Sequence, residues 1–173
     1  NILCYATSSA IYQSTDAGKS FFQLPLNPGG TGSNNKEITS IAVARWSSNP
    51  TIAVGTRDTD NAQYGGIYIL DTNESFFWID TNIGNYDVYA VAFSPNFATD
   101  RQLVAVVTDE TNTFVTSRIG NGSWGNIMSS ARLDKDNSGT PTPVSVDTSA
   151  TIAFPDDYNA ITGKTVLFVA IDA

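Results

Sequence analysis

The chain contains no histidine and a single cysteine, Cys4, among its 173 residues. The absence of histidine excludes a histidine-dependent catalytic triad, histidine metal ligands and a histidine proton shuttle. One cysteine excludes an internal disulfide and a cysteine-rich zinc site. Histidine-based catalysis and cysteine- or histidine-bound zinc are therefore not expected.

Positive charge and long apolar runs are scarce as well. Lys and Arg total 9 against 17 Asp and Glu, which gives a formal net charge of −8. Because no Lys/Arg cluster stands out, neither nucleic acid nor an anionic membrane surface is expected as a partner. No apolar run approaches the roughly 20 residues that span a bilayer, so we expect no membrane-spanning segment.

The polar share of the composition is carried by Ser, Thr and Asn, while charged residues make up only 15%. Such residues are typical of strands and turns rather than of surface helices. The acidic composition with little Lys and Cys favours an extracellular or cell-surface protein. An acidic cytosolic β protein is the alternative.

Short apolar segments alternate with turn residues along the whole chain, without a sustained helical period. Many short strands at even spacing predict an all-β sandwich, barrel or propeller. The expected strands are residues 2–7, 10–14, 21–24, 38–44, 51–56, 66–71, 76–80, 88–93, 102–108, 113–118, 123–126, 151–154 and 165–172.

Two landmarks recur at a spacing of roughly fifty residues, which favours the propeller. One is an apolar strand, a loop and a second apolar strand; the other is an aromatic residue that opens a later strand. The first strands are centred on Ile41, Val91 and Ala153, and the aromatics are Phe21, Phe76 and Trp124. A unit of about fifty residues with four antiparallel strands is typical of a propeller blade.

The repeat divides the chain into blades. Residues 38–83 and 86–130 are expected to form full blades, residues 1–28 the last three strands of a blade, and residues 148–173 the first two strands of another. Propellers typically close with four to eight blades. About two full and two partial blades therefore predict an incomplete propeller, a piece of a larger one whose edge strands are open or paired with another chain.

Residues 14–21, STDAGKSF, match the Asp-box pattern S/T-x-D-x-G-x-S/T-W/F. The defining positions are Ser14, Asp16, Gly18, Ser20 and Phe21. A carboxylate at Asp16 can accept backbone N–H groups within the turn, and Gly18 allows a positive φ. The aromatic is expected to pack under the turn and to fix the start of the last strand. The motif is thus a folding device, not a catalytic one.

Degenerate copies of the motif occur in LDTNESFF and SRIGNGSW, residues 70–77 and 117–124. The chain therefore resembles the sialidase-like, Asp-box (BNR-repeat) β-propeller superfamily. The loop SPNFATDRQLVAVV also resembles a linker of bacterial cell-surface and S-layer-associated repeat proteins. The resemblance implies a structural protein, or a module that binds protein or glycan, whose partners are the rest of the same propeller or other chains.

The alternative is a fragment of a sialidase-like glycoside hydrolase whose catalytic residues lie elsewhere. A sialidase needs converging arginines, a Tyr–Glu pair and an acid/base Asp. None of the five arginines carries a recognisable catalytic signature, and Arg101 is interpreted as part of a turn. Glutamate occurs only at Glu37, Glu74 and Glu110, in loops or turns without a convincing Tyr partner. No catalytic residue is therefore predicted.

The segment DKDNSGT, residues 134–140, is the best candidate for a metal site. Asp134, Asp136, Ser138 and the Thr140 carbonyl match positions 1, 3, 5 and 7 of a calcium loop. Position 12 is Ser145 rather than the Glu of an EF-hand. The segment is therefore interpreted either as a structural calcium site or as a solvated turn. The segment 58–66 is a weaker echo of the same pattern.

Two sequons, at Asn73 and Asn121, are candidate N-glycosylation sites in predicted hairpin turns. Asn-rich chains also produce such triplets by chance. Trp46, Tyr64 and Tyr86 are candidates for a carbohydrate platform, with packing between blades as the alternative.

Overall fold

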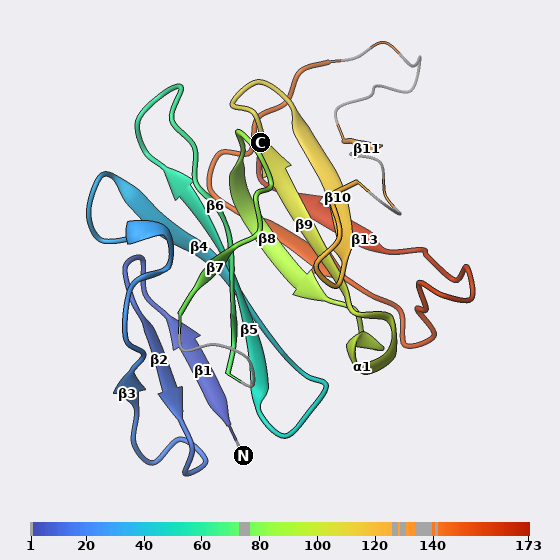
Figure 1. Ribbon diagram of the computed structural model, residues 1–173. Helices are drawn as coiled ribbons and strands as arrows, with labels where there is room; N and C mark the ends of the chain where they lie inside the picture. The colour runs from blue at the N-terminus through green and yellow to red at the C-terminus, as the bar shows by residue number, and fades with distance from the viewer. Residues whose placement is uncertain (1, 73–76, 126–127, 129–130, 134–139, 141) are drawn as a thin grey trace.

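The computed structural model describes residues 2–72, 77–125, 128, 131–133, 140 and 142–173. The described chain is all-β and forms four small sheets, each built from strands that follow one another in sequence (Figure 1). All neighbouring strands are antiparallel. The all-β prediction is therefore confirmed.

The first sheet contains β1 (Leu3–Ala6), β2 (Ile11–Ser14) and β3 (Phe22–Gln23), and the short helix η1 (Pro28–Gly30) follows it. The second contains β4 (Lys36–Arg45), β5 (Pro50–Asp58), β6 (Gly66–Asp71) and β7 (Ile79–Asp80). The third contains β8 (Asp87–Phe93), β9 (Gln102–Thr108), β10 (Thr113–Ile119) and β11 (Ala131–Arg132), with the helix α1 (Phe97–Asp100) between β8 and β9. The fourth contains β12 (Ala150–Ala153) and β13 (Phe168–Ile171).

Local features of the structure differ from the expected strands. The described residues 123–125 form no strand, and the edge of the third sheet is instead β11. Turn hydrogen bonds from Gly122 N to Ile119 O and from Gly125 N to Ser117 O curl the chain at this point. The loop after β8 also contains α1, which the sequence pattern did not indicate.

The sheets pack face to face in chain order, and β5 shows how. Ile52 and Val54 pack with the first sheet, whereas Ala53 between them packs with the third. All three side chains are fully buried. Because successive side chains of a strand point to opposite faces, an unbroken apolar strand can cover two neighbours at once. β5, an inner strand of the second sheet, therefore contributes to two cores.

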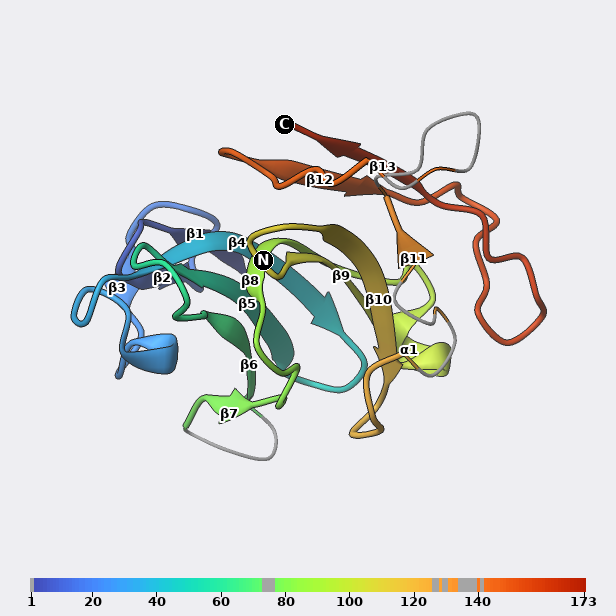
Figure 2. The same ribbon diagram turned by 90° about the horizontal axis from the view of Figure 1, so that it is seen from above.

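The third sheet repeats this arrangement. Figure 2 shows β12 and β13 lying against one side of it, with the second sheet on its other side. In β9, Leu103, Ala105 and Val107 pack with the second sheet, and Val104 and Val106 pack with the fourth. Each fully buried Val or Leu side chain contributes about 1.5–3 kcal/mol. Burial on both faces thus holds the second and third sheets in place.

A β-bulge marks the first strand of both four-stranded sheets. The register shifts between Ile38 and Ser40 in β4, and between Val88 and Ala90 in β8. The extra residue of β4, Thr39, places its hydroxyl within hydrogen-bond distance of the Val88 carbonyl of the third sheet. The Val91 N–H donates to Ser40 Oγ at 3.0 Å. The bulge therefore gives polar contacts between the second and third sheets.

The helices of the described residues are short, and none has the length and apolarity to cross a membrane.

Candidate functional site

The Asp-box turn connects β2 to β3 and is closed by its own side chains. Ser14 Oγ accepts the Gly18 N–H at 2.8 Å and donates to Asp16 Oδ1 at 2.7 Å. Asp16 accepts the Ser20 N–H at 3.0 Å and the Ser20 hydroxyl at 2.6 Å. Gly18 has a φ of 89°, which favours glycine. These bonds stay within the turn, so the geometry is that of a structural device.

Phe21 differs from the expectation. Its side chain is 41% exposed, and its ring meets the edge of the Tyr5 ring with centroids 5.0 Å apart. The Leu3 side chain, not Phe21, lies beneath Gly18, where an added Cβ would stand 3.1 Å from Leu3 Cδ1. The prediction that the aromatic packs under the turn was wrong, because Leu3 of β1 takes that place.

We predict that the ionised Asp16 carboxylate stabilises the fold and that this stabilisation is lost in acid. Hydrogen bonds from the Ser20 hydroxyl, the Ser20 N–H and the Ser14 hydroxyl hold the pKa of Asp16 well below its ordinary value. Because the unfolded pKa is about 3.9, the stabilisation is complete above that pH and is lost as pH falls through the folded pKa. Thermal melts of Asp16→Asn should therefore depend less on pH below about pH 4 than those of the wild type. An exposed control, Asp157→Asn, should keep the wild-type slope; equal slopes for all three proteins would contradict the prediction.

The third segment of the repeat keeps part of the motif. Ser117 is buried and its Oγ accepts the Met128 N–H at 3.2 Å. The Trp124 indole donates to Thr81 Oγ1 at 3.2 Å and packs with the core between the second and third sheets. In the second copy, residues 73–76 lie outside the described residues.

The loop SPNFATDR between β8 and β9 is organised by two buried polar residues. The Ser94 hydroxyl donates to Asp100 Oδ2 at 2.5 Å, and Asp100 Oδ1 accepts the Gln102 N–H at 3.0 Å. Arg101 then follows α1 with a left-handed φ of 56°. Its guanidinium lies 3.4 Å from the centre of the Trp46 ring. Arg101 is therefore held across the end of β4, and not only in a surface turn.

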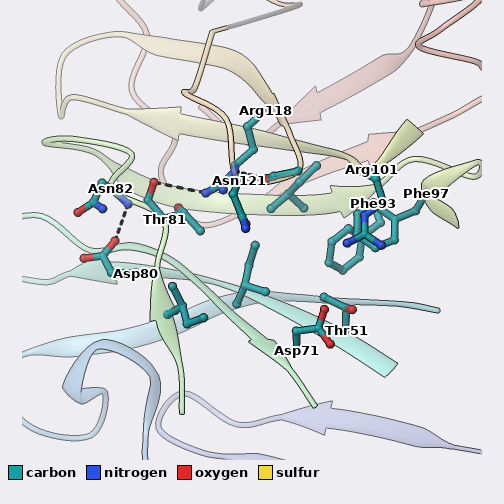
Figure 3. Close-up of a pocket in the computed structure, with 14 residues that line it drawn as sticks. Thr51, Asp71, Asp80, Thr81, Asn82, Phe93, Phe97, Arg101, Arg118 and Asn121 are labelled. Carbon is teal, nitrogen blue, oxygen red and sulfur yellow. Dashed lines mark hydrogen bonds between the residues drawn. The ribbon is translucent and has the colours of Figure 1, made fainter. Parts of the chain in front are cut away.

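A cavity of about 330 Å³ lies between the second and third sheets at this end of the molecule (Figure 3). Apolar side chains of both sheets contribute to its lining, including Ile69 and Leu103. Ligand pockets typically have volumes of roughly 300–1,000 Å³, so the cavity lies at the small end of that range. We name it the inter-sheet cavity.

Two residues that line the inter-sheet cavity each carry a buried polar atom that lacks a hydrogen-bond partner among the described residues. The atoms are Thr51 Oγ1 and Arg101 Nη1. The Thr51 side chain is nine-tenths or more buried, because only 3% of the residue is exposed. A buried polar group without a partner costs about 1–3 kcal/mol. A ligand oxygen that hydrogen-bonds at this wall of the cavity would therefore remove the cost of leaving these groups unpaired.

The structure brings together two of the five arginines. Arg101 and Arg118 both line the inter-sheet cavity, and burial lowers the pKa of Arg118. Arg57 lies elsewhere and pairs with Glu37 Oε2 at 3.0 Å. Arg45 is exposed, and Arg132 hydrogen-bonds Asn112. The sequence did not indicate the pair, because their positions follow from the loop geometry of Arg101 and the register of β10.

A second cavity, of about 360 Å³, gathers acidic residues of the segment 58–66 with Asp87 and Glu110. Asp87 Oδ1 accepts the N–H groups of Asp58 at 2.8 Å and Gly65 at 2.9 Å, and burial raises the pKa of Asp87. In the part of the chain that the structure describes, no three His, Cys, Asp or Glu side chains are arranged to hold a metal ion. The carboxylates here bind backbone N–H groups instead.

The remaining candidate sites have different outcomes. Asp134, Asp136 and Ser138 lie outside the described residues, as does Asn73, and Thr140 is exposed. The calcium loop thus stays a prediction. Asn121 is exposed in the turn after β10 and also lines the mouth of the inter-sheet cavity.

The three candidate platform aromatics are all partly buried. Trp46 lies under Arg101, and Tyr86 packs with Phe114 in the core between the second and third sheets. Tyr64 belongs to the segment 58–66, whose acidic residues line the second cavity. Its carbonyl accepts a hydrogen bond from Lys36 Nζ at 3.1 Å. None of the three forms an open aromatic surface.

Comparison of the chain with family models, with curated proteins and with solved structures finds no match.

Proposed function

We propose that the chain is a segment of a non-catalytic β-propeller from a cell-surface or secreted protein, with a structural role and a capacity to bind protein or glycan. The observation that carries the proposal is the face-to-face stacking of four antiparallel sheets in chain order. The first strands β4, β8 and β12 also contact one another in succession. Successive sheets with neighbouring first strands are what blades of one propeller require.

The outer faces of the two terminal sheets support this role. On the first sheet, Leu3 and Tyr5 are 48% and 43% exposed on the face turned away from the second sheet. On the fourth, Phe168 is 64% exposed on the face turned away from the third. Exposed apolar faces mark places where another element packs. In the proposal, further blades or other chains cover them.

Association through these faces gives a direct test. We expect the wild-type chain to self-associate as its concentration rises, and the double variant Leu3→Glu/Phe168→Glu to remain monomeric in sedimentation velocity runs. At Phe168, which is 64% exposed, the free energy of unfolding should change by no more than about 0.5 kcal/mol. Leu3 is only 48% exposed and also contacts the Asp-box turn, so urea denaturation of the variant accompanies the association measurement. Ile161→Glu, which changes an equally exposed side chain in the loop between β12 and β13, is the matched control. A wild-type monomer at every concentration would contradict the proposed covering of these faces.

The non-catalytic part of the proposal is tested separately. Incubation with sialosides and with aryl glycosides of common sugars should release no product. Turnover that disappears in Arg101→Gln or Arg118→Gln would instead favour the glycoside hydrolase alternative. That alternative needs further catalytic groups around the two arginines, such as Asp71 and Asp80 of the same cavity.

A further inference from the structure

We propose that the inter-sheet cavity binds one neutral sugar residue of a glycan, an inference that rests on the proposed function and gives it a site. The cavity lies between two sheets that are each fixed on both faces, so its walls are preformed. Preformed walls reduce the ordering cost of binding. The class of ligand follows from the charged side chains at the two ends of the cavity.

One end is formed by Arg101 and Asp71 with Thr51 (Figure 3). Arg101 Nη1 and Thr51 Oγ1 are the two buried atoms without partners among the described residues. Asp71 Oδ2 accepts the Trp46 indole N–H at 3.1 Å, and Trp46 in turn lies under the Arg101 guanidinium. The aromatic ring thus fixes both charged groups at this end, beside the two buried donors that lack partners.

The other end is formed by Arg118 and Asp80 with Asn121 (Figure 3). Arg118 is 6% exposed and donates from Nε to the Gly120 carbonyl at 2.9 Å. Asp80 Oδ1 accepts the Asn82 N–H at 2.8 Å. This end therefore also contains a guanidinium and a carboxylate.

Each end thus combines a group that only donates hydrogen bonds with one that only accepts them. An anion would meet a carboxylate at either end, and a cation would meet a guanidinium. Hydroxyl groups both donate and accept, so a neutral ligand with hydroxyls at both ends can hydrogen-bond to a guanidinium and to a carboxylate at each end. The apolar part of the lining, which includes Ile69, Leu103 and the Phe93 ring, suits the C–H face of a sugar ring.

The experiment titrates the protein with neutral sugars and follows binding by saturation-transfer NMR and calorimetry. The probes are glucose, galactose, mannose and N-acetylglucosamine, with maltose, cellobiose and lactose, each to about 10 mM so that a Kd near 1 mM is detected. We expect at least one probe to bind. Thr51→Val should weaken it about five- to tenfold, and Arg101→Gln more than about tenfold.

Two matched variants outside the cavity serve as controls. Thr151→Val on β12 and Arg45→Gln at the end of β4 alter exposed residues and should leave the affinity unchanged. Thr51→Val should also melt no lower than the wild type, because it removes a hydroxyl that has no partner. Should Arg101→Gln fold poorly, Arg101→Lys keeps the charge and should still lose most of the affinity.

The outcomes divide cleanly. Sugar binding that Thr51→Val and an Arg101 variant both weaken supports the site. The proposal is overturned by the absence of binding for every probe, by binding that these variants leave unchanged, or by tighter binding of inorganic sulfate or phosphate. Hydrolysis of a bound disaccharide would overturn the non-catalytic function while leaving the sugar site in place, so the two failures are distinguishable.

Discussion

Replacing Ile52 with alanine is expected to lower the free energy of unfolding by about 2–5 kcal/mol. Ile52 is fully buried in the middle of β5, where it packs with Ile11 and Leu24 of the first sheet. The cavity left by the substitution lies between the second sheet, which is packed on both faces, and the first sheet, whose other face is uncovered. The first sheet can therefore move partly into the cavity, and the loss should lie in the lower half of that range.

Chemical denaturation with urea measures this loss, and a cross-strand neighbour provides the control. Val43 of β4 stands opposite Ile52 in the register, yet its side chain is 46% exposed. Val43→Ala should therefore cost less than about 1 kcal/mol. If both substitutions cost the same, the core between the first two sheets does not carry the stability that its burial indicates.

The second large effect is expected at Gly65, where alanine should cost about 3 kcal/mol or more. An added Cβ would stand 1.9 Å from the Thr56 carbonyl oxygen and 2.7 Å from Arg57 Cα. Both atoms belong to the backbone of β5, which cannot move aside as a flexible side chain can. The displacement would also disturb the Gly65 N–H that donates to Asp87 Oδ1 of the third sheet. Gly65→Ala therefore strains one sheet and loosens its link to the next.

The neighbouring glycine separates this contact from a general effect of glycine replacement. The atoms nearest to an added Cβ at Gly66 belong to the Tyr68 side chain, at 3.3–3.4 Å. We expect Gly66→Ala to cost about 1 kcal/mol or less, because the ring can shift slightly. Thermal melts of the two variants, each with its far-ultraviolet circular dichroism, decide the matter. A Gly65→Ala protein that melts within 2 °C of the wild type, on the scale of about 2–4 °C for 1 kcal/mol in a domain of this size, would contradict the expectation.

The sequence predicted most strands because their local signals are strong. β6 and β9 begin and end at the predicted residues 66–71 and 102–108, since apolar and β-branched runs there are bounded by Gly-Gly, Asp-Arg and Thr-Asp. The antiparallel order within each sheet follows from the short connections. α1 was missed because its four residues are stabilised by a buried hydrogen bond between Ser94, which precedes the helix, and Asp100, its last residue.

The inter-sheet cavity could not be predicted in the same way. Thr51, Asp71, Arg101 and Arg118 stand far apart in the sequence. Asp71 and Arg118 lie in the degenerate Asp-box copies and Arg101 in the linker-like loop, but these motifs indicate turns rather than a ligand site. The proximity of the four residues depends on how the second sheet is placed against the third, and on the left-handed backbone at Arg101. The pattern of apolar residues along a strand predicts neither the placement of one sheet against another nor a left-handed backbone. The position of Arg101 also relies on Trp46, whose stacking on a guanidinium has no signature in sequence.

The one-sided burial of the terminal sheets also determines where the molecule opens first. β5 and β9 lie between neighbours on both faces, whereas β1 and β13 have one uncovered face each. When every unit contacts only the units next to it, stability is close to a sum of nearest-neighbour interfaces, and the ends fray before the centre. Backbone amides of β1 and β13 should therefore exchange with deuterium at low opening free energies, while those of β5 and β9 exchange only through global unfolding. A covering partner would slow exchange at the ends and leave the middle unchanged.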